Sequence, residues 1–218
     1  MKCILCQTSH SAPFKVDKKP LRSYFHCAEC DLIFLNPTER LAPQEEKTRY
    51  DQHDSHGSAG HGAFLEPLVK EIDGYIGAAK VARDTLSVFD FGCGPQPVLS
   101  QMFASKGYKT AHYDLYYHPN QDLLRKSYHV ITSTEVWEHL YEPRKEIEIL
   151  MKALKTGGLL GVMTSAHHGE AVFHDWHYRR DTTHVTFFSE NTMNWLAKTY
   201  KLQIIKARSP YWVFQKMI

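Results

Sequence analysis

Val88-Phe-Asp90-Phe-Gly92-Cys93-Gly94-Pro95 is an apolar run that breaks into two near-adjacent glycines. It predicts a buried strand that turns sharply beneath a small molecule, with Asp90 just before the turn. A glycine-rich loop that opens a helix usually binds phosphate, because free N–H groups and the helix dipole attract anions. Asp90 would repel a pyrophosphate there and attract an ammonium group. Pro97 also stands where the dinucleotide fingerprint G-x-G-x-x-G has its third glycine.

The loop therefore suits a nucleoside ligand that bears positive charge. S-adenosylmethionine, with its sulfonium and α-amino groups, fits this description. The hydrophobic-Asp-x-Gly-x-Gly pattern resembles the first motif of class I methyltransferases. The resemblance implies S-adenosylmethionine as cofactor, with Asp90, Gly92, Cys93 and Gly94 at its binding site.

A second acidic residue follows at the spacing that a nucleotide site requires. We expect residues 109–113 to form a second strand, which ends at Asp114, 20 residues after Gly94. In a βαβ nucleotide site an acid at this distance accepts hydrogen bonds from the ribose hydroxyls. The alternative is a simple turn aspartate at a strand end. With the glycine loop in place we predict ribose binding at Asp114, and we include the adjoining Leu115 in the cofactor site.

The segment Thr134-Glu135-Val136-Trp137-Glu138-His139 follows a strand that begins at residue 128. It resembles the fourth-strand motif of the same superfamily, and the resemblance implies that Thr134, Glu135 and Val136 border the cofactor. Glu138 and His139 have two interpretations. One is a helix-capping charge and a packed imidazole, and the other is a catalytic role.

Four of the five cysteines form two C-x-x-C turns, Cys3/Cys6 and Cys27/Cys30. Two such turns supply the four thiolates of a tetrahedral zinc site, which leaves no open position for catalysis. We therefore predict a structural Zn²⁺ in a ribbon over residues 1–37, with a short two-stranded hairpin between the turns. The alternatives are a disulfide pair or unrelated thiols, and a reducing compartment disfavours the first.

Residues 38–63 are mostly polar, and residues 49–62 contain too many glycines and histidines to predict a regular element. This segment is interpreted either as a linker or as a lid over the cofactor. In the second case Tyr50 and His53 would contact the cofactor.

From residue 64 the chain alternates between helical spacing and short buried runs, which predicts a Rossmann-like, mostly parallel α/β sheet in residues 64–218. The chain between Asp114 and residue 128 is too short for the usual helix, strand and helix, so we expect a sheet trimmed at its third-strand edge. An antiparallel hairpin closes the sheet at the C-terminus. The expected helices are 64–76, 97–107, 143–155 (ended by Gly157-Gly158) and 189–200, and the expected strands are 86–91, 109–113, 128–134, 159–164, 202–207 and 212–216.

The stretch after the fifth strand emerges on the cofactor side of the sheet and is rich in proton-exchanging groups. Its run W-H-Y-R-R-D-x-T-H-V-x-F-F, from residue 176, resembles a bacterial branch of small-molecule methyltransferases with N-terminal zinc ribbons. His177 or His184 could act as a base, with Asp181 orienting an imidazole, and Arg179 and Arg180 could bind an anionic acceptor. The alternative is that Asp181 and His184 only fix the loop by hydrogen bonds.

Composition sets the remaining limits. The formal net charge of the 218 residues is +2, so nothing demands nucleic acid or an anionic membrane as partner. No apolar run approaches the ~20 residues of a membrane span, and the first residues lack the apolar region of a signal peptide. We therefore expect a cytoplasmic protein without a membrane partner, and the oligomeric state stays open.

The favoured function is S-adenosylmethionine-dependent methyl transfer to a small-molecule acceptor by in-line displacement. The rival is an RNA-directed methyltransferase or a non-catalytic RNA-binding protein that uses the zinc ribbon. A basic strip on the ribbon supports the rival, although a solvated charged face explains it equally well. The strip consists of Lys15, Lys18, Lys19 and Arg22.

Overall fold

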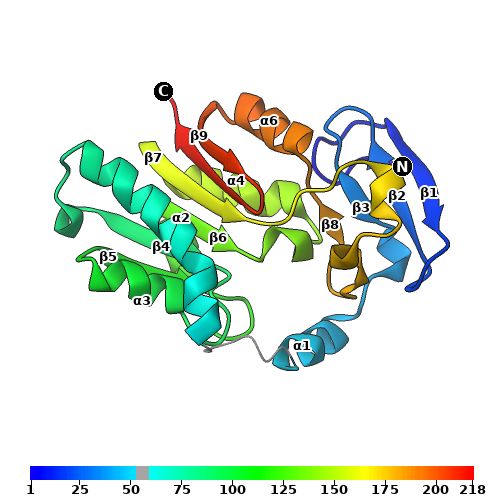
Figure 1. Cartoon of the computed structure of the whole chain (residues 1–218), viewed down its shortest axis with the longest axis horizontal. Helices are drawn as coiled ribbons and strands as arrows, with labels where there is room; N and C mark the ends of the chain where they lie inside the picture. The colour runs from blue at the N-terminus through cyan, green and yellow to red at the C-terminus, as the bar shows by residue number, and fades with distance from the viewer. Residues whose placement is uncertain (53–58) are drawn as a thin grey trace.

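The computed structural model describes residues 1–52 and 59–218, and two β-sheets organise them (Figure 1). The larger sheet has the strand order β5-β4-β6-β7-β10-β9, and the smaller one has the order β1-β2-β3-β8. The strands of the larger sheet are β4 (Ser87–Phe91), β5 (Lys109–Tyr113), β6 (Tyr128–Thr134), β7 (Leu154–Met163), β9 (Leu202–Arg208) and β10 (Tyr211–Lys216).

The larger sheet is parallel except at its C-terminal hairpin. β4 pairs in parallel with β5 and β6, and β6 pairs in parallel with β7. β10 pairs antiparallel with both β7 and β9. The predicted Rossmann-like class with an antiparallel closing hairpin is confirmed.

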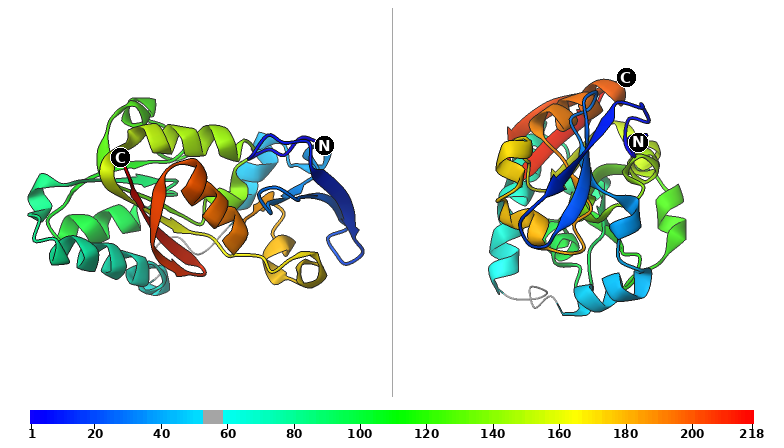
Figure 2. Two further views of the ribbon diagram at one scale, coloured as in Figure 1. Left: turned by 90° about the horizontal axis from the view of Figure 1, so that it is seen from above. Right: turned by 90° about the vertical axis from the view of Figure 1, so that its right-hand side faces the viewer.

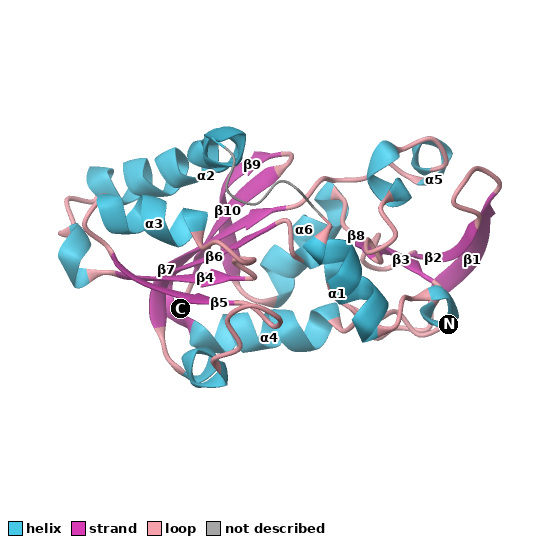
Figure 3. Ribbon diagram, turned by 90° about the horizontal axis from the view of Figure 1, so that it is seen from below, coloured by secondary structure: helices cyan, strands magenta, loops and turns pink. Residues whose placement is uncertain are grey.

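Helices cover both faces of this sheet, because alternate strand residues are apolar on each face. Phe89, Ile131 and Leu160 pack under α4 (Pro143–Ala153) and α6 (Glu190–Thr199). Val88 and Val130 pack on the other face under α2 (Ala59–Ala78) and α3 (Val98–Ser105). Figure 3 shows α2 and α3 on one side of the strands and α4 on the other.

The sheet is trimmed where the sequence predicts it. β5 is the edge strand, and between it and β6 the chain forms only a short bridge, Asp114 with His118, and η3 (Gln121–Arg125). Within residues 1–52 and 59–218 no strand pairs with the outer edge of β5.

Two predictions about helices were wrong. The sequence predicted no regular element in residues 49–62, but two helices reach into this segment. α1 (Pro43–Asp51) ends within it, and α2 begins within it at Ala59 rather than at residue 64. Pro43 suits the first turn of α1, and the Glu45 carboxylate accepts a hydrogen bond from the Ala42 N–H at 3.0 Å. These local caps start the helix although its composition is polar.

The glycine pair at 157–158 does not end a helix. α4 ends at Ala153, and β7 begins at Leu154 and runs through both glycines. A Cβ at Gly158 would lie 2.8 Å from the carbonyl oxygens of His129 and Lys155. Gly158 therefore permits a close backbone approach inside the sheet, beside the irregular register of β6.

The N-terminal ribbon is β1 (Ser11–Val16), β2 (Arg22–Cys27) and β3 (Ile33–Leu35), which agrees with the predicted hairpin. β8 (Thr186–Phe187), from the far end of the chain, pairs antiparallel with β3 and completes its sheet. Figure 2 shows the ribbon against one end of the larger sheet. The remaining elements are α5 (Glu170–Phe173), η1 (Pro37–Glu39), η2 (Arg83–Thr85), η4 (Trp137–His139) and η5 (His177–Arg180).

None of the helices in the described part of the chain is both long enough and apolar enough to cross a membrane.

Candidate functional site

The glycine loop follows the carboxyl end of β4 and lies against the carboxyl end of β5. Gly92 and Gly94 have φ values of +80° and +66°, which favour glycine. The N–H groups of Gly92 and Cys93 both donate to the Tyr113 carbonyl, at 2.8 and 3.1 Å. A Cβ at Gly92 would lie 2.3 Å from Val136 Cγ2, so the loop is pressed against the residue that follows β6.

Asp90 lies beneath this loop. Its side chain is 2% exposed, and Thr132 Oγ1 donates to its carboxylate at 3.1 Å. Burial raises the pKa of Asp90 to about 7, and the nearby Asp114 carboxylate acts in the same direction. A bound cation above the loop would favour the ionised form.

Asp114 is fixed by three backbone donors. Its Oδ2 accepts from Gly94 N–H at 3.0 Å, and its Oδ1 accepts from the N–H groups of Tyr116 and Tyr117 at 2.9 and 3.1 Å. An ionised carboxylate offers about four acceptor positions, so one remains free. Asp114 and the glycine loop, 20 residues apart in sequence, are thus joined at one edge of the sheet.

The other predicted cofactor residues lie at the same edge. The Cys93 thiol is partly buried, and burial raises its pKa. Leu115 is 62% exposed just beyond β5. Thr134 is the last residue of β6, and Glu135 follows in a left-handed conformation, with φ +54°.

Tyr50 joins α1 to the carboxyl ends of the strands through two ring contacts. Its ring contacts the rings of His139, at 5.2 Å between centroids, and Tyr116, at 5.8 Å. The buried Glu46 carboxylate on α1 accepts from the hydroxyls of Tyr50 and Tyr116, at 3.2 and 2.7 Å. His53 lies outside the described residues.

A second cluster lies where the loop after β6 meets the segment 165–185. Glu138 is fully buried, and the Tyr178 hydroxyl donates to its Oε1 at 2.5 Å. The rings of His139 and His184 lie 4.8 Å apart. Val185 N–H donates to the Glu138 carbonyl at 2.8 Å, which fixes the two segments together.

Burial shifts the ionisation of this cluster. It raises the pKa of Glu135 to about 9, with the Glu138 carboxylate adding to the shift. Burial also lowers the pKa of His139 to about 4. Perturbed groups in one place are typical of functional sites.

The residues predicted as a catalytic set have different surroundings, although His184 N–H donates to the Asp181 carbonyl at 3.3 Å. His184 is buried in the cluster, and its Nδ1 lies 2.6 Å from the Tyr178 carbonyl. His177 is exposed at the start of η5. Asp181 Oδ1 accepts from both the N–H and the hydroxyl of Thr183, at 2.9 and 2.7 Å, and its Oδ2 lies 3.9 Å from Arg49.

Arg179 does not face an acceptor. It is 1% exposed and donates to the carbonyls of His174, Lys18 and Pro20. The prediction that it binds an anionic acceptor was wrong, because these carbonyls occupy the guanidinium. Arg180, the other predicted anion ligand, is exposed.

The four cysteines of the ribbon come together as one cluster. Their sulfur atoms all lie within 4.8 Å of one another, with 3.6 Å between Cys3 and Cys30 and 3.5 Å between Cys6 and Cys27. Tetrahedral zinc with bonds of about 2.3 Å would place sulfurs roughly 3.8 Å apart. Hydrogen bonding from Cys30 lowers the pKa of Cys3 to about 5, against the opposing effect of burial. The cluster therefore fits zinc in both spacing and chemistry.

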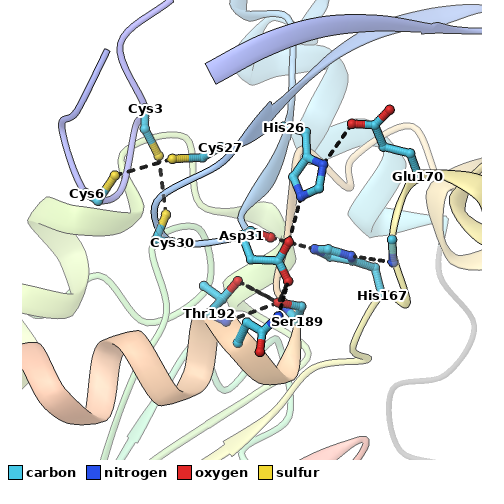
Figure 4. Close-up of polar contacts among 12 residues, drawn as sticks. Cys3, Cys6, His26, Cys27, Cys30, Asp31, His167, Glu170, Ser189 and Thr192 are labelled. Atoms are coloured by element: carbon cyan, nitrogen blue, oxygen red, sulfur yellow. Dashed lines mark hydrogen bonds and ion pairs between the residues drawn. The ribbon is translucent and has the colours of Figure 1, made fainter. Parts of the chain in front are cut away.

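Asp31, next to Cys30, links this cluster to the rest of the chain (Figure 4). Its Oδ1 lies 2.7 Å from His26 Nε2, and its Oδ2 accepts from Ser189 Oγ at 2.6 Å. Its carbonyl accepts from His167 Nε2 at 2.9 Å. His26 Nδ1 in turn lies 2.8 Å from Glu170. The ribbon is thus joined to both ends of the 165–189 region.

Sequence reasoning missed Tyr178, Glu46 and Asp31. Tyr178 stands inside the W-H-Y-R-R run, but the flanking histidines drew the catalytic prediction. Glu46 is one of two adjacent acids in a polar stretch, and Asp31 directly follows Cys30. No local pattern distinguishes them, because their partners come from distant parts of the chain.

The parallel sheet, the glycine loop and the acids at its carboxyl edge define a class I methyltransferase fold. A family model described as a methyltransferase domain matches residues 39–207, which is most of the chain. The chain belongs to this methyltransferase family, and the predicted enzyme class is confirmed.

Two solved structures illustrate the shared fold. The 1,6-didemethyltoxoflavin-N1-methyltransferase of Burkholderia thailandensis, with bound 1,6-didemethyltoxoflavin and S-adenosylhomocysteine, is 13% identical with a TM-score of 0.58, over 94% of this chain and 99% of that chain. The magnesium protoporphyrin IX methyltransferase of Synechocystis PCC 6803, with bound S-adenosylhomocysteine, is 13% identical with a TM-score of 0.50, over 78% and 92%. No curated protein sequence matches this chain.

Proposed function

We propose that this protein transfers the methyl group of S-adenosylmethionine to a small-molecule acceptor that binds between the carboxyl edge of the larger sheet and residues 165–185. The supporting observation is that the chain just after β6 contacts both the glycine loop and the 165–185 segment. Val136 presses on the glycine loop, and Glu138 and His139 directly after it meet Tyr178 and His184. Cofactor loop and reactive side chains are therefore neighbours.

The cofactor side would be built from backbone and carboxylates. Gly92 and Gly94 permit close approach of a ligand, and Asp90 beneath them favours a cationic one. Asp114 has one acceptor position left for a ribose hydroxyl. Thr134, Glu135 and Val136 would border the pocket, and Tyr50 would cover it.

When bound, the cofactor supplies a methyl group that an acceptor takes by in-line displacement at the sulfonium. The chain has to align the acceptor, exclude water and accept a proton where the acceptor carries one. His184 is the better placed of the two predicted bases, because it is buried while His177 is exposed. Its Nδ1 faces a carbonyl, which can only accept, so Nε2 is the basic nitrogen.

We also propose that Cys3, Cys6, Cys27 and Cys30 hold one structural Zn²⁺. Their spacing fits a tetrahedral site, and a ribbon of fewer than about 40 residues rarely folds without a metal or another staple.

The RNA-directed rival draws less support. Two of the four basic-strip residues hold the ribbon to the 165–185 segment: Lys18 pairs with Asp175, and Arg22 donates to the Thr182 carbonyl at 3.1 Å. These contacts explain the charges of Lys18 and Arg22 without nucleic acid, while Lys15 and Lys19 are exposed.

The test is calorimetric titration of zinc-loaded protein with S-adenosylmethionine and S-adenosylhomocysteine. We expect micromolar binding by the wild type and at least tenfold weaker binding by Asp90→Ala and Asp114→Ala. Asp84→Ala, an exposed acid in η2, is the matched control and should bind as the wild type does. Absence of binding by folded protein would overturn the proposal, and RNA binding at low salt that is lost on neutralising the strip would favour the rival.

A further inference from the structure

Three side chains beside the cofactor loop converge as metal ligands do. One ring nitrogen of His139, one of His184 and one carboxylate oxygen of Glu138 all lie within 4.8 Å of one another. These residues come from η4, shortly after β6, and from the 165–185 segment, and they share no atom with the four-cysteine cluster.

Hydrogen bonds orient both imidazoles for binding. His139 Nδ1 lies 3.2 Å from the Thr183 carbonyl, and His184 Nδ1 lies 2.6 Å from the Tyr178 carbonyl. A carbonyl only accepts, so each Nδ1 carries the hydrogen and each Nε2 keeps its lone pair. Histidines that ligate metals are held in this way, with the other ring N–H donated to a carbonyl or carboxylate.

The carboxylates supply an independent observation. Glu138 is fully buried; its Oε1 accepts from Tyr178, but its Oε2 has no hydrogen-bond partner in the described part of the chain. The buried Oε1 of the neighbouring Glu135 also lacks one there. A buried carboxylate oxygen without a partner is costly, and a cation is the ligand that would compensate it.

Glu135 is brought into place by its backbone. It adopts φ +54°, which a non-glycine residue rarely does and which is common where function constrains the chain. The Glu138 carboxylate adds to the rise in the pKa of Glu135, so the two acids are neighbours, but Glu135 is not among the three residues whose ligand atoms lie within 4.8 Å of one another.

We propose that Glu138, His139 and His184 bind one divalent transition-metal cation whose open positions take an oxygen of the methyl acceptor. Two imidazoles and a carboxylate suit Mn²⁺, Fe²⁺ or Zn²⁺ and leave coordination positions free. This inference rests on the proposed methyl transfer, and it makes the acceptor a hydroxyl compound.

The cation would activate that hydroxyl. A metal-bound O–H releases its proton more easily, as metal-bound water does. The proton then passes to solvent, because His184 Nε2 binds the cation and no longer acts as the base. The resulting oxygen then forms a bond to the methyl carbon while the carbon–sulfur bond breaks. The sulfur keeps the electron pair, so the products are a methyl ether or ester and neutral S-adenosylhomocysteine.

The test uses Mn²⁺ as probe, because its paramagnetic signal reports binding without any acceptor. Because Zn²⁺ would compete for the same ligands, the protein is loaded with only one Zn²⁺ per chain, the amount that the four cysteines hold. We expect this protein to bind one Mn²⁺ per chain, with a nitrogen coupling in the pulsed spectrum that disappears when both imidazoles are replaced. Glu138→Gln and His184→Gln should each weaken binding at least tenfold. His168→Gln, an exposed histidine on the same segment, is the matched control and should not.

Folding has to be checked in each variant by circular dichroism and by titration with S-adenosylmethionine. Tyr178→Phe offers a milder change, since it removes only the hydroxyl partner of Glu138, and it should shift Mn²⁺ affinity less than Glu138→Gln does. No Mn²⁺ binding up to millimolar concentration, or binding equal in all folded variants, overturns the metal site.

The two proposals fail in different ways. Protein that binds S-adenosylmethionine but no Mn²⁺ retains the proposed function and loses the metal site. Protein that binds Mn²⁺ at these residues but no S-adenosylmethionine retains the site and overturns the proposed methyl transfer.

Discussion

The two sides of the candidate site are held together by different means. On the cofactor side, formed by Gly92, Gly94 and Asp114, the contacts are hydrogen bonds that backbone N–H groups of the glycine loop donate to the Tyr113 carbonyl and the Asp114 carboxylate. On the acceptor side, formed by Glu138, His139, Tyr178 and His184, they are mainly side-chain contacts between segments about 40 residues apart, with one backbone hydrogen bond from Val185 to Glu138. The cofactor side depends on the sheet, and the acceptor side depends on how the 165–185 segment is anchored.

That anchoring comes largely from the ribbon. β8 pairs with β3, Arg179 binds the carbonyls of Lys18 and Pro20, and Asp31 binds Ser189. The acceptor side is therefore built on the ribbon, while the cofactor side is built on the larger sheet. Variants that affect one side and spare the other test this division.

The largest effect is expected from removing metal from the four cysteines. Structural zinc contributes about 10–16 kcal/mol of apparent binding free energy in zinc-finger peptides, so its loss should disorder the ribbon. Hydrogen exchange should then quicken at residues 183–188, where β8 has lost its partner, and stay slow at residues 88–91. Restoring Zn²⁺ should reverse the change. Unaltered protection at 183–188 in metal-free protein would contradict the division.

The next effect concerns the cofactor side alone. Gly92→Ala adds a Cβ 2.3 Å from Val136 Cγ2 at a residue with φ +80°. Gly107→Ala is its matched control, because Gly107 has φ +91° but nothing within 4 Å of its Cβ. Both should lose roughly 1–2 kcal/mol of unfolding free energy from left-handed strain.

Gly92→Ala should lose more, because the clash displaces the loop or Val136. Urea unfolding measures the difference, and calorimetry should show at least tenfold weaker cofactor binding for Gly92→Ala only. Equal losses in the two variants would mean that the loop yields without harm to the site.

The third effect is a pH dependence of the free energy of unfolding, which comes from Asp90. Its pKa is about 7 in the folded protein against a model-compound value of 3.8, so between these pH values the folded state holds a proton that the unfolded state has lost. The stability that Asp90 contributes is therefore full below pH 3.8 and is lost as pH rises to about 7, by at most about 1.4 kcal/mol per pH unit. Asp90→Asn should lack this slope in urea unfolding followed from pH 4 to 8.

Cofactor binding should show the opposite trend. A cationic ligand favours ionised Asp90, so affinity for S-adenosylmethionine should rise with pH up to about 7 in the wild type. In Asp90→Asn it should be weaker and flatter. A wild-type affinity that is constant over this range would argue against contact between the ligand's charge and Asp90.

The contrast between the two sides also explains what the sequence could predict. Asp90, the glycines and Asp114 follow one another within 25 residues on a strand, turn, helix and strand, so their meeting at one edge follows from local pattern. The trimmed edge followed from chain length alone. Contact between Tyr178 and Glu138 depends on how β8 docks on β3, and two residues of pairing leave no periodic signal.

Two of the errors have the same origin. Gly157-Gly158 has the sequence pattern of a helix C-cap, but the close approach of the His129 carbonyl puts it inside β7. Arg179 has the charge of an anion ligand, but three carbonyls surround it. In both cases the decisive neighbour lies on another element, where sequence spacing gives no information.

The smallest effect is expected where α1 connects the two sides. Glu46 is 8% exposed and accepts from Tyr116, which follows Asp114 on the cofactor side, while Tyr50 of the same helix touches His139 on the acceptor side. Tyr116→Phe leaves the Glu46 carboxylate with one hydroxyl donor fewer, which should lower the free energy of unfolding by about 1 kcal/mol.

Tyr117→Phe, which loses a contact to the exposed Asp51, is the matched control and should lower it less. Hydrogen exchange in α1 and the dissociation rate of S-adenosylmethionine should both increase in Tyr116→Phe. If exchange increases but dissociation does not, α1 joins the two sides without covering the cofactor.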